Sequence, residues 1–234
     1  MKTVYITLIF LIGLFSNSLL AQDCNLYLPA DLGTKWEITN FNAKGKAQSI
    51  SKFELINKVT SGTDITFTVK TSYCDEKGRE QGSSTFDAFC KNGVFEFDFE
   101  YFLNNMNTEA YEEMNIEVEM DMTTFELARF SDPVGTKLDD YTITMDMKTN
   151  GMGTMSMKME YKDRELMAKE SRTTTAGTFD CIVVSQNIST KMSIIDTETS
   201  SKDWYSEGVG MVRSEYYSKK GKLESYTELT SLTK

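Results

Sequence analysis

The chain has 234 residues, with 25 basic and 35 acidic side chains, a formal net charge of −10 and no histidine. The absence of histidine excludes Ser-His-Asp catalysis, Cys-His catalysis and imidazole-bound zinc within this chain. The excess of acidic residues disfavours binding to the phosphates of nucleic acids and to anionic lipid head groups.

Residues 1–21 have the layout of a secretory signal peptide. Lys2 supplies the positive start, residues 4–20 are almost wholly apolar, and Ala21 is the small residue near which cleavage is expected. The stretch is too short and wrongly flanked for a transmembrane anchor. Asp23 stands where a lipoprotein signal has a small residue before its cysteine. We therefore expect a soluble protein that is secreted or periplasmic.

The four cysteines, Cys24, Cys74, Cys90 and Cys181, all follow this signal. An even number of cysteines in an exported chain favours disulfides. Cys74 and Cys90 bracket a turn-rich segment at 75–78, so the predicted pairs are Cys74–Cys90 and Cys24–Cys181. The chain contains neither a C-x-x-C motif nor a histidine, so we predict no metal site.

Alternation of apolar and polar residues, the signal of a half-buried strand, dominates the chain after the signal peptide. In the first half the alternating segments are 36–41, 53–55, 65–69 and 95–101. The last of these carries Glu96, Asp98 and Glu100 on one side, which fits a solvated strand face better than a calcium site. One short helix is expected within residues 100–114.

The second half continues the same pattern. Its alternating segments are 116–122, 142–148, 154–162, 181–188, 202–205, 210–217 and 223–229. The turn sequence at 150–153 predicts a hairpin between two of them. The chain has only 2 prolines and no linker of biased composition. We therefore predict a mainly β fold in a single domain over residues 22–234: a single curled antiparallel sheet forming an open barrel, with a β-sandwich as the alternative.

A short sequence echo links the two halves of the chain. Residues 32–37 (LGTKWE) recur as residues 134–139 (VGTKLD), each time just before an alternating segment. Either two halves of similar construction, about 22–130 and 131–234, or the ordinary use of glycine in turns before strands explains the echo.

Methionines gather on the predicted strands. The chain has 14 of them, and period-two spacing places several on one strand face. Trp204 and Tyr205 add large side chains with polar tips to the candidate lining. The candidate ligand-lining residues are Met120, Met122, Met145, Met147, Met155, Met157, Met159, Trp204 and Tyr205.

Three interpretations of this methionine pattern stay open. Methionine is unbranched and fills irregular gaps in an ordinary core. The same soft side chains suit a pliable cavity for an apolar or lipid-like ligand. Thioether sulfur also binds Cu(I).

Several segments carry a family resemblance. They are CNLYLP (24–29), GTKW (33–36), PVGTKLDD (133–140), TTTAGTFDC (173–181), DWY (203–205), GVGMVRSE (208–215) and KGKL (220–223). With them the chain resembles the TapB-like family of exported bacterial proteins, a domain of unknown function. The resemblance implies a curled antiparallel sheet, distantly like the open barrels of lipoprotein carriers, and no known reaction. Ala176 stands where the family commonly has proline.

The sequence thus predicts an exported, non-enzymatic protein without cofactors. Its expected role is to bind an apolar or lipid-like ligand in a cavity lined by methionine and aromatic side chains. The alternative is an interaction or structural protein of the envelope, with a filled core and no small-molecule ligand.

Overall fold

The computed structural model describes residue 24 and residues 26–91, 94–97, 116–122, 127–149, 153–192 and 195–234. The expected signal peptide at 1–21 and the expected helix within 100–114 lie outside these residues. Asp98 and Glu100 of the acidic strand face lie outside them too. Within the described ranges the regular structure is all strand, with no helix.

The strands form one antiparallel sheet, and the prediction of a mainly β chain with a single antiparallel sheet is confirmed. Across the sheet the order is β5-β4-β3-β2-β1-β12-β11-β10-β9-β8-β7-β6. In chain order the strands are β1 (Lys35–Asn42), β2 (Ala47–Ser61), β3 (Asp64–Asp75), β4 (Glu80–Lys91), β5 (Val94–Phe97), β6 (Ile116–Met122), β7 (Tyr141–Thr149), β8 (Gly153–Thr174), β9 (Gly177–Met192), β10 (Ile195–Ser206), β11 (Gly210–Ser218) and β12 (Leu223–Thr233).

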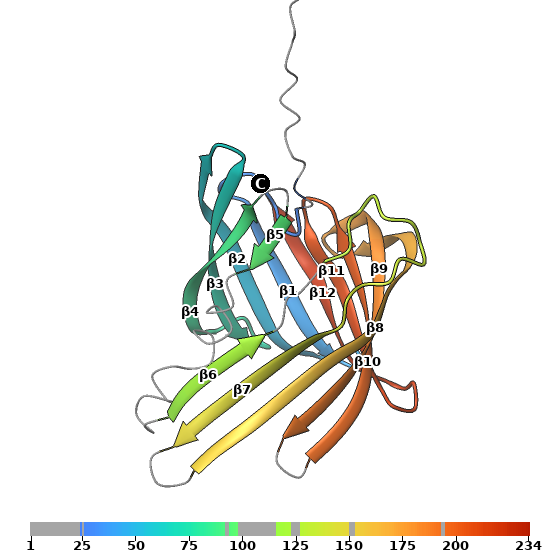
Figure 1. Ribbon diagram of the computed structural model, residues 1–234. Coiled ribbons are helices and arrows are strands. Elements are labelled where there is room, and N and C mark those ends of the chain that lie inside the picture. Colours follow the sequence, from blue (N-terminus) through green and yellow to red (C-terminus); the bar gives the residue numbers. More distant parts are fainter. Residues whose placement is uncertain are drawn as a thin grey trace, which may run out of the picture.

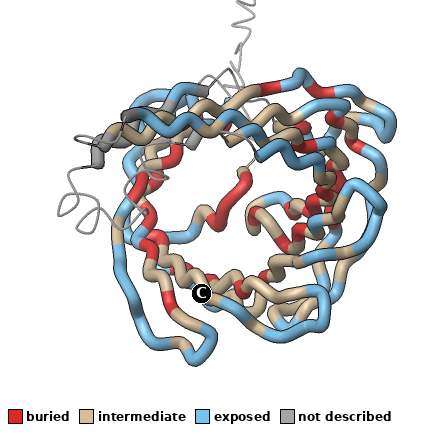
Figure 2. Tube along the Cα trace, turned by 90° about the horizontal axis from the view of Figure 1, so that it is seen from below, coloured by how far each residue is buried: buried red, intermediate tan, exposed pale blue. Residues whose placement is uncertain are grey.

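The sheet curls around an interior (Figure 1). Seen along that interior, the strands make a ring with a buried stretch of chain inside it (Figure 2). Strand β1 pairs with β12, which brings the first and last strands together in the middle of the sheet. The edge strands β5 and β6 share no backbone pairing among the described residues, so these hydrogen bonds do not close the ring.

Chain from outside the strands fills part of the interior. Tyr27, from the segment before β1, and Ala128 and Leu138, from the segment before β7, belong to the same buried cluster. The Tyr27 hydroxyl donates a hydrogen bond to the Ala128 carbonyl. The Tyr27 ring centroid lies 5.0 Å from that of Phe130 and 5.2 Å from that of Tyr205. The segment around Tyr27 therefore acts as a plug within the curled sheet.

A disulfide between Cys24 and Cys90 ties this plug to β4, and both predicted pairings are wrong. The register of β3 and β4 gives the reason, because Cys74 lies beside the turn while Cys90 pairs with Ile65 at the far end of the hairpin. At roughly 3.4 Å of strand per residue, the two positions are about 30 Å apart. Cys74 and Cys181 are buried free thiols.

The two echoed turns are built in the same way. Gly33 donates its N–H to the Leu55 carbonyl at 2.8 Å, and Gly135 donates to the Leu166 carbonyl at 2.8 Å. Leu55 and Leu166 are fully buried, and each is followed by an irregularity in strand register. Both glycines have positive φ, +82° and +94°, which explains why glycine recurs there. The division into two similar halves stays a prediction.

Candidate functional site

The hairpin of β7 and β8 places the predicted methionines opposite one another. Direct cross-strand pairs join Met147 to Met155, Met145 to Met157, and Ile143 to Met159. Residues that pair directly share a face of the sheet, so these side chains form one patch. The period-two pattern of each strand and the antiparallel pairing of β7 with β8 bring these residues opposite one another.

The patch continues onto the neighbouring strands. Met157 pairs with Met192 of β9, while Met120 and Met122 of β6 pair in backbone register with Met145 and Ile143. The side chains of Met120 and Met122 lie outside the described residues. We call the remaining set the methionine face; it consists of Met145, Met147, Met155, Met157, Met159 and Met192.

The methionine face is partly open. Met145 is buried, at 7% exposure, whereas Met155 is 42% exposed. The other members are half-buried. In the described part of the chain, neither cluster of buried hydrophobic residues includes a methionine of this face. These thioethers are therefore not packed into the core that surrounds the plug.

Two stacked tyrosines end the methionine face. Tyr141 and Tyr161 are direct cross-strand partners, with ring centroids 4.2 Å apart and ring planes 7° from parallel. The Tyr161 hydroxyl lies 3.9 Å from the Met159 sulfur. Tyr141 also lines a cavity of about 30 Å³ with Tyr27 of the plug and Tyr205. Tyr141 therefore faces the interior, and so do its cross-strand partner Tyr161 and the methionines that share this face of the sheet.

Beyond the tyrosines lies a buried carboxylate, Asp203, which is 4% exposed. It accepts hydrogen bonds from Ser201 at 2.9 Å, from Gln186 at 2.9 Å and from Ser214. Burial raises its pKa to about 6, while these three hydrogen bonds and Arg164 act in the opposite direction. Burial is the larger effect because a desolvated carboxylate favours its neutral form.

Arg164 is the cation of this cluster and is only 3% exposed. Its guanidinium donates to the Asp139 carbonyl at 2.7 Å and to Gln186 at 3.3 Å. It also lies 4.8 Å from the centroid of the Tyr141 ring. These contacts occupy the guanidinium within the protein.

The tyrosines around this cluster are neutral at ordinary pH. Burial raises the pKa of Tyr161 to about 12 and moves the pKa values of Tyr141, Tyr205 and Tyr216 above their usual value. Asp203 contributes to each of these shifts. Their hydroxyls therefore act as uncharged donors and acceptors.

The two predicted aromatic residues lie on opposite faces of β10. Tyr205 belongs to the interior cluster. Trp204 belongs to a second cluster with Cys181 and Val183, and its indole N–H donates to Glu170 at 2.7 Å. Successive strand residues point to opposite faces, so Trp204 does not line the interior with the methionines.

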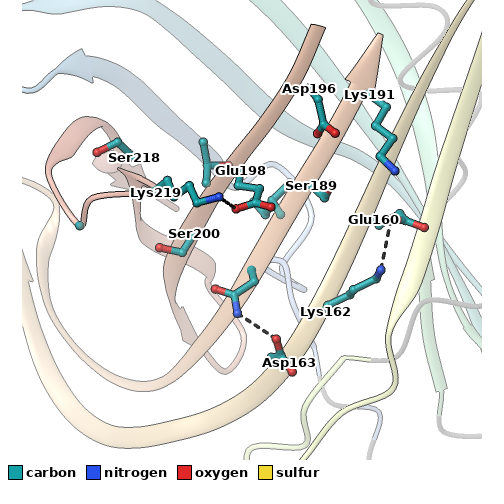
Figure 3. A pocket seen from close by; sticks show the side chains of 14 residues that line it. Glu160, Lys162, Asp163, Ser189, Lys191, Asp196, Glu198, Ser200, Ser218 and Lys219 are labelled. Carbon is teal, nitrogen blue, oxygen red and sulfur yellow. Dashed lines mark hydrogen bonds and ion pairs between the residues drawn. The ribbon is translucent and has the colours of Figure 1, made fainter. Parts of the chain in front are cut away.

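A groove of about 590 Å³ lies on the other face of β8, β9 and β10. On β8 its side chains alternate with those of the methionine face, and half of the lining residues are charged (Figure 3). Lys219 pairs with Glu198 at 2.5 Å, and Lys162 pairs with Glu160 at 3.2 Å. The lining charges thus largely pair with one another.

A second groove, of about 670 Å³, reaches the free thiol of Cys181. Burial raises the pKa of this thiol to about 11, so it is protonated and poorly nucleophilic at neutral pH. Across the described ranges, no group of three or more His, Cys, Asp or Glu side chains is arranged to hold a metal ion.

Sequence reasoning missed the Asp203 cluster. Its members come from β8, β9, β10 and β11, and no repeating pattern marks them among the other polar residues of those strands. No local spacing links Arg164 to Gln186 or Ser214. Only the register of the strands brings them together. The methionine pattern was visible because it repeats within each strand.

A family model and two crystal structures are similar to this chain. A family model described as DUF3108-like matches residues 31–229. A crystal structure from Bacteroides fragilis, of an exported-protein candidate with a YmcC-like fold, is 21% identical, with a TM-score of 0.70 over 90% of this chain and 100% of that one. No protein of curated function matches the sequence.

A second similar crystal structure is that of a lipoprotein candidate from Parabacteroides distasonis. It is 28% identical, with a TM-score of 0.71 over 91% of this chain and 100% of that one. The match over residues 31–229 is to the DUF3108-like family model, while the TapB-like resemblance stays a prediction. In the part of the chain that is described, no helix is long and apolar enough to cross a membrane.

Proposed function

The chain belongs to the DUF3108-like family, and we propose that it is an exported binding protein that holds the hydrocarbon part of a lipid-like ligand on the methionine face. It performs no bond-breaking chemistry. The open, thioether-rich interior face is the observation that carries this proposal.

Export is supported by three independent features. Residues 1–21 read as a signal peptide. The Cys24–Cys90 disulfide fits an oxidising compartment outside the cytoplasm. Similar structures come from exported-protein and lipoprotein candidates. Because the Cys24 sulfur is in the disulfide, it is not free to carry a lipid thioether, which favours a soluble protein over a lipid-anchored one.

The methionine face has the properties that a pliable hydrocarbon site needs. Cross-strand pairing puts Met145, Met157 and Met192 in one row, with Met147 and Met155 beside them. Unbranched thioether side chains adapt to different chain shapes. Burial of six ligand methylenes there contributes about 5 kcal/mol before the entropy of binding is subtracted.

The nucleophile and acid candidates are poorly placed for catalysis. The chain has no histidine, and the Cys181 thiol is protonated at neutral pH because its pKa is about 11. The Asp203 carboxylate is buried and already accepts three hydrogen bonds. These features favour a carrier or receptor over an enzyme.

Fluorescence titration with diphenylhexatriene, an apolar probe without a head group, tests this function on the solvent-extracted protein. Met157→Gln and Met159→Gln should each weaken probe binding by about tenfold, since each places an amide in an apolar contact. Met167→Gln is the matched control, because Met167 lies on the same strand, is 39% exposed and belongs to the register irregularity outside the face.

Two results would reject the proposed function. The first is a wild-type protein that binds no probe after extraction, which would favour the envelope-interaction alternative. The second is a Met167→Gln variant that loses as much affinity as Met157→Gln.

A further inference from the structure

The interior changes from apolar to polar where the methionine face meets the tyrosines. Tyr161 follows Met159 on the same face of β8, because the two residues are two positions apart. Tyr216 of β11 pairs directly with Ser201, one of the residues that hold Asp203. The Asp203 charge acts on the pKa of both tyrosines. Tyr161 and Tyr216 therefore lie around the same buried carboxylate.

Tyr216 is the tyrosine of this group that a ligand can reach most easily. It is 37% exposed, although its partner Ser201 and the carboxylate Asp203 are buried. Its phenol is neutral and shares one hydrogen bond with the Ser214 side chain, which leaves further hydrogen-bonding capacity for a ligand. The end of the methionine face thus presents hydrogen-bonding groups without a net charge of their own.

The charges beside these tyrosines are already balanced within the protein. Arg164 is held by the Asp139 carbonyl, by Gln186 and by the Tyr141 ring. An anionic head group would therefore meet the Asp203 carboxylate, while Arg164, the cation of this cluster, already has partners within the described part of the protein. A cationic head group would have to give up its hydration for a carboxylate that three donors already satisfy.

We infer that the bound amphiphile has an uncharged head, a hydroxyl or an ester, that hydrogen-bonds to the phenols of Tyr161 and Tyr216 while its chain lies on the methionine face. This inference rests on the proposed function and narrows it to neutral amphiphiles. It also assigns a specificity role to two tyrosines that the sequence did not single out.

Displacement of diphenylhexatriene by three oleyl compounds tests the inference. Monoolein is neutral, oleate is anionic and oleylamine is cationic, while the hydrocarbon chain is the same. Monoolein should displace the probe at the lowest concentration. Tyr161→Phe and Tyr216→Phe should each weaken monoolein binding by about fivefold, the effect of one hydrogen bond.

Tyr226→Phe is the matched control. Tyr226 stacks on Phe41 at 4.9 Å and lies under the Arg213 guanidinium, whereas Tyr216 shares its strand face with Ser214. Removal of the Tyr226 hydroxyl should leave monoolein binding unchanged. Two results would overturn the head-group inference in a wild type that still binds the probe. One is tighter binding of oleate or oleylamine than of monoolein, and the other is unchanged monoolein affinity in both tyrosine variants. Loss of probe binding by the wild type would instead overturn the proposed function.

Discussion

A buried aspartate is an unusual component of a β-sheet interior, and Asp203 is stabilised by an uncommon number of donors. Three side chains from three strands donate to it, and Arg164 lies nearby. Its pKa nevertheless rises to about 6, because burial outweighs these contacts. The cluster is thus held together at some expense of stability when the carboxyl is ionised.

This balance predicts a pH dependence. The carboxyl binds its proton more tightly in the folded state than in the unfolded chain, where its pKa is near 3.8. Its contribution to stability is therefore complete below about pH 4 and is lost as the pH rises through 6. In the wild type, this loss lowers the free energy of unfolding by roughly 2–3 kcal/mol. The Asp203→Asn variant should not show this loss, because it has no carboxyl to titrate.

Urea unfolding of the wild type and Asp203→Asn between pH 4 and 7 measures the effect. Other carboxyls, such as Glu215, have lowered pKa values and act in the opposite direction. The difference between the two proteins isolates Asp203, because both share those other groups. Parallel curves for the two proteins over this range would show that Asp203 titrates normally.

At the residue scale, the sequence predicted the side chains that repeat along a strand and missed the contacts that depend on how strands pair. The methionines of β7 and β8 pair as the alternation indicates. Trp204 and Tyr205 were grouped together, yet adjacent strand residues face opposite sides, and only Tyr205 reaches the interior. The contact between Arg164 and Gln186 depends on the register of β8 and β9, which no local sequence signal determines.

Hairpins were the elements most readily predicted. Strands β7 and β8 pair as consecutive antiparallel strands, which is the hairpin that the sequence at 150–153 predicts. The predicted Cys74–Cys90 disulfide was wrong because the sequence does not show at which end of the β3–β4 hairpin each cysteine lies. The true partner of Cys90 is Cys24, which lies in an irregular segment without any periodic pattern.

Loss of this disulfide should loosen the plug. Cys24→Ser and Cys90→Ser should each lower the free energy of unfolding by roughly 2–4 kcal/mol, since the bond closes a long loop. The double variant should be no less stable than either single variant, because both changes break the same bond. Additive losses in denaturant unfolding, or a non-reduced peptide map that joins Cys74 to Cys90, would contradict the observed pairing.

The plug also depends on a glycine at the start of β11. Gly210 has φ +97°, and a Cβ there would overlap the Tyr27 carbonyl oxygen. Gly210→Ala should therefore cost about 3 kcal/mol or more in thermal or chemical unfolding. Gly208→Ala is the control: its φ is +68° but nothing lies within 4 Å, so only backbone strain of about 1–2 kcal/mol applies. Equal losses would show that the plug does not pack there.

At the scale of the whole molecule, the two echoed turns allow a comparison of matching positions. Phe53 lies two residues before Leu55, and Arg164 lies two residues before Leu166. Phe53 stacks on Trp36 at 5.2 Å, an ordinary apolar contact. Arg164 instead supports the Asp203 cluster. The sheet thus accommodates an aromatic pair at the position of Phe53, which matches that of Arg164. The curl of the sheet therefore does not require a charged side chain such as Arg164 at this position.

The molecule therefore combines a stapled, filled region around the plug with a softer methionine face. The buried cluster around Tyr27 and Leu55 gives rigidity. The half-buried thioethers retain freedom to repack around a guest. This division suits the proposed function, in which an exported protein accepts hydrocarbon chains of varied shape.

Methyl NMR of protein labelled at the methionine ε-carbons, recorded with and without monoolein, tests this account most directly. Single Met→Leu variants assign the signals. We expect the signals of Met145, Met157 and Met159 to shift on binding, while the exposed Met167 stays in place. A saturating titration that leaves these three signals unmoved, or that shifts only Met167, would contradict a hydrocarbon site on the interior face.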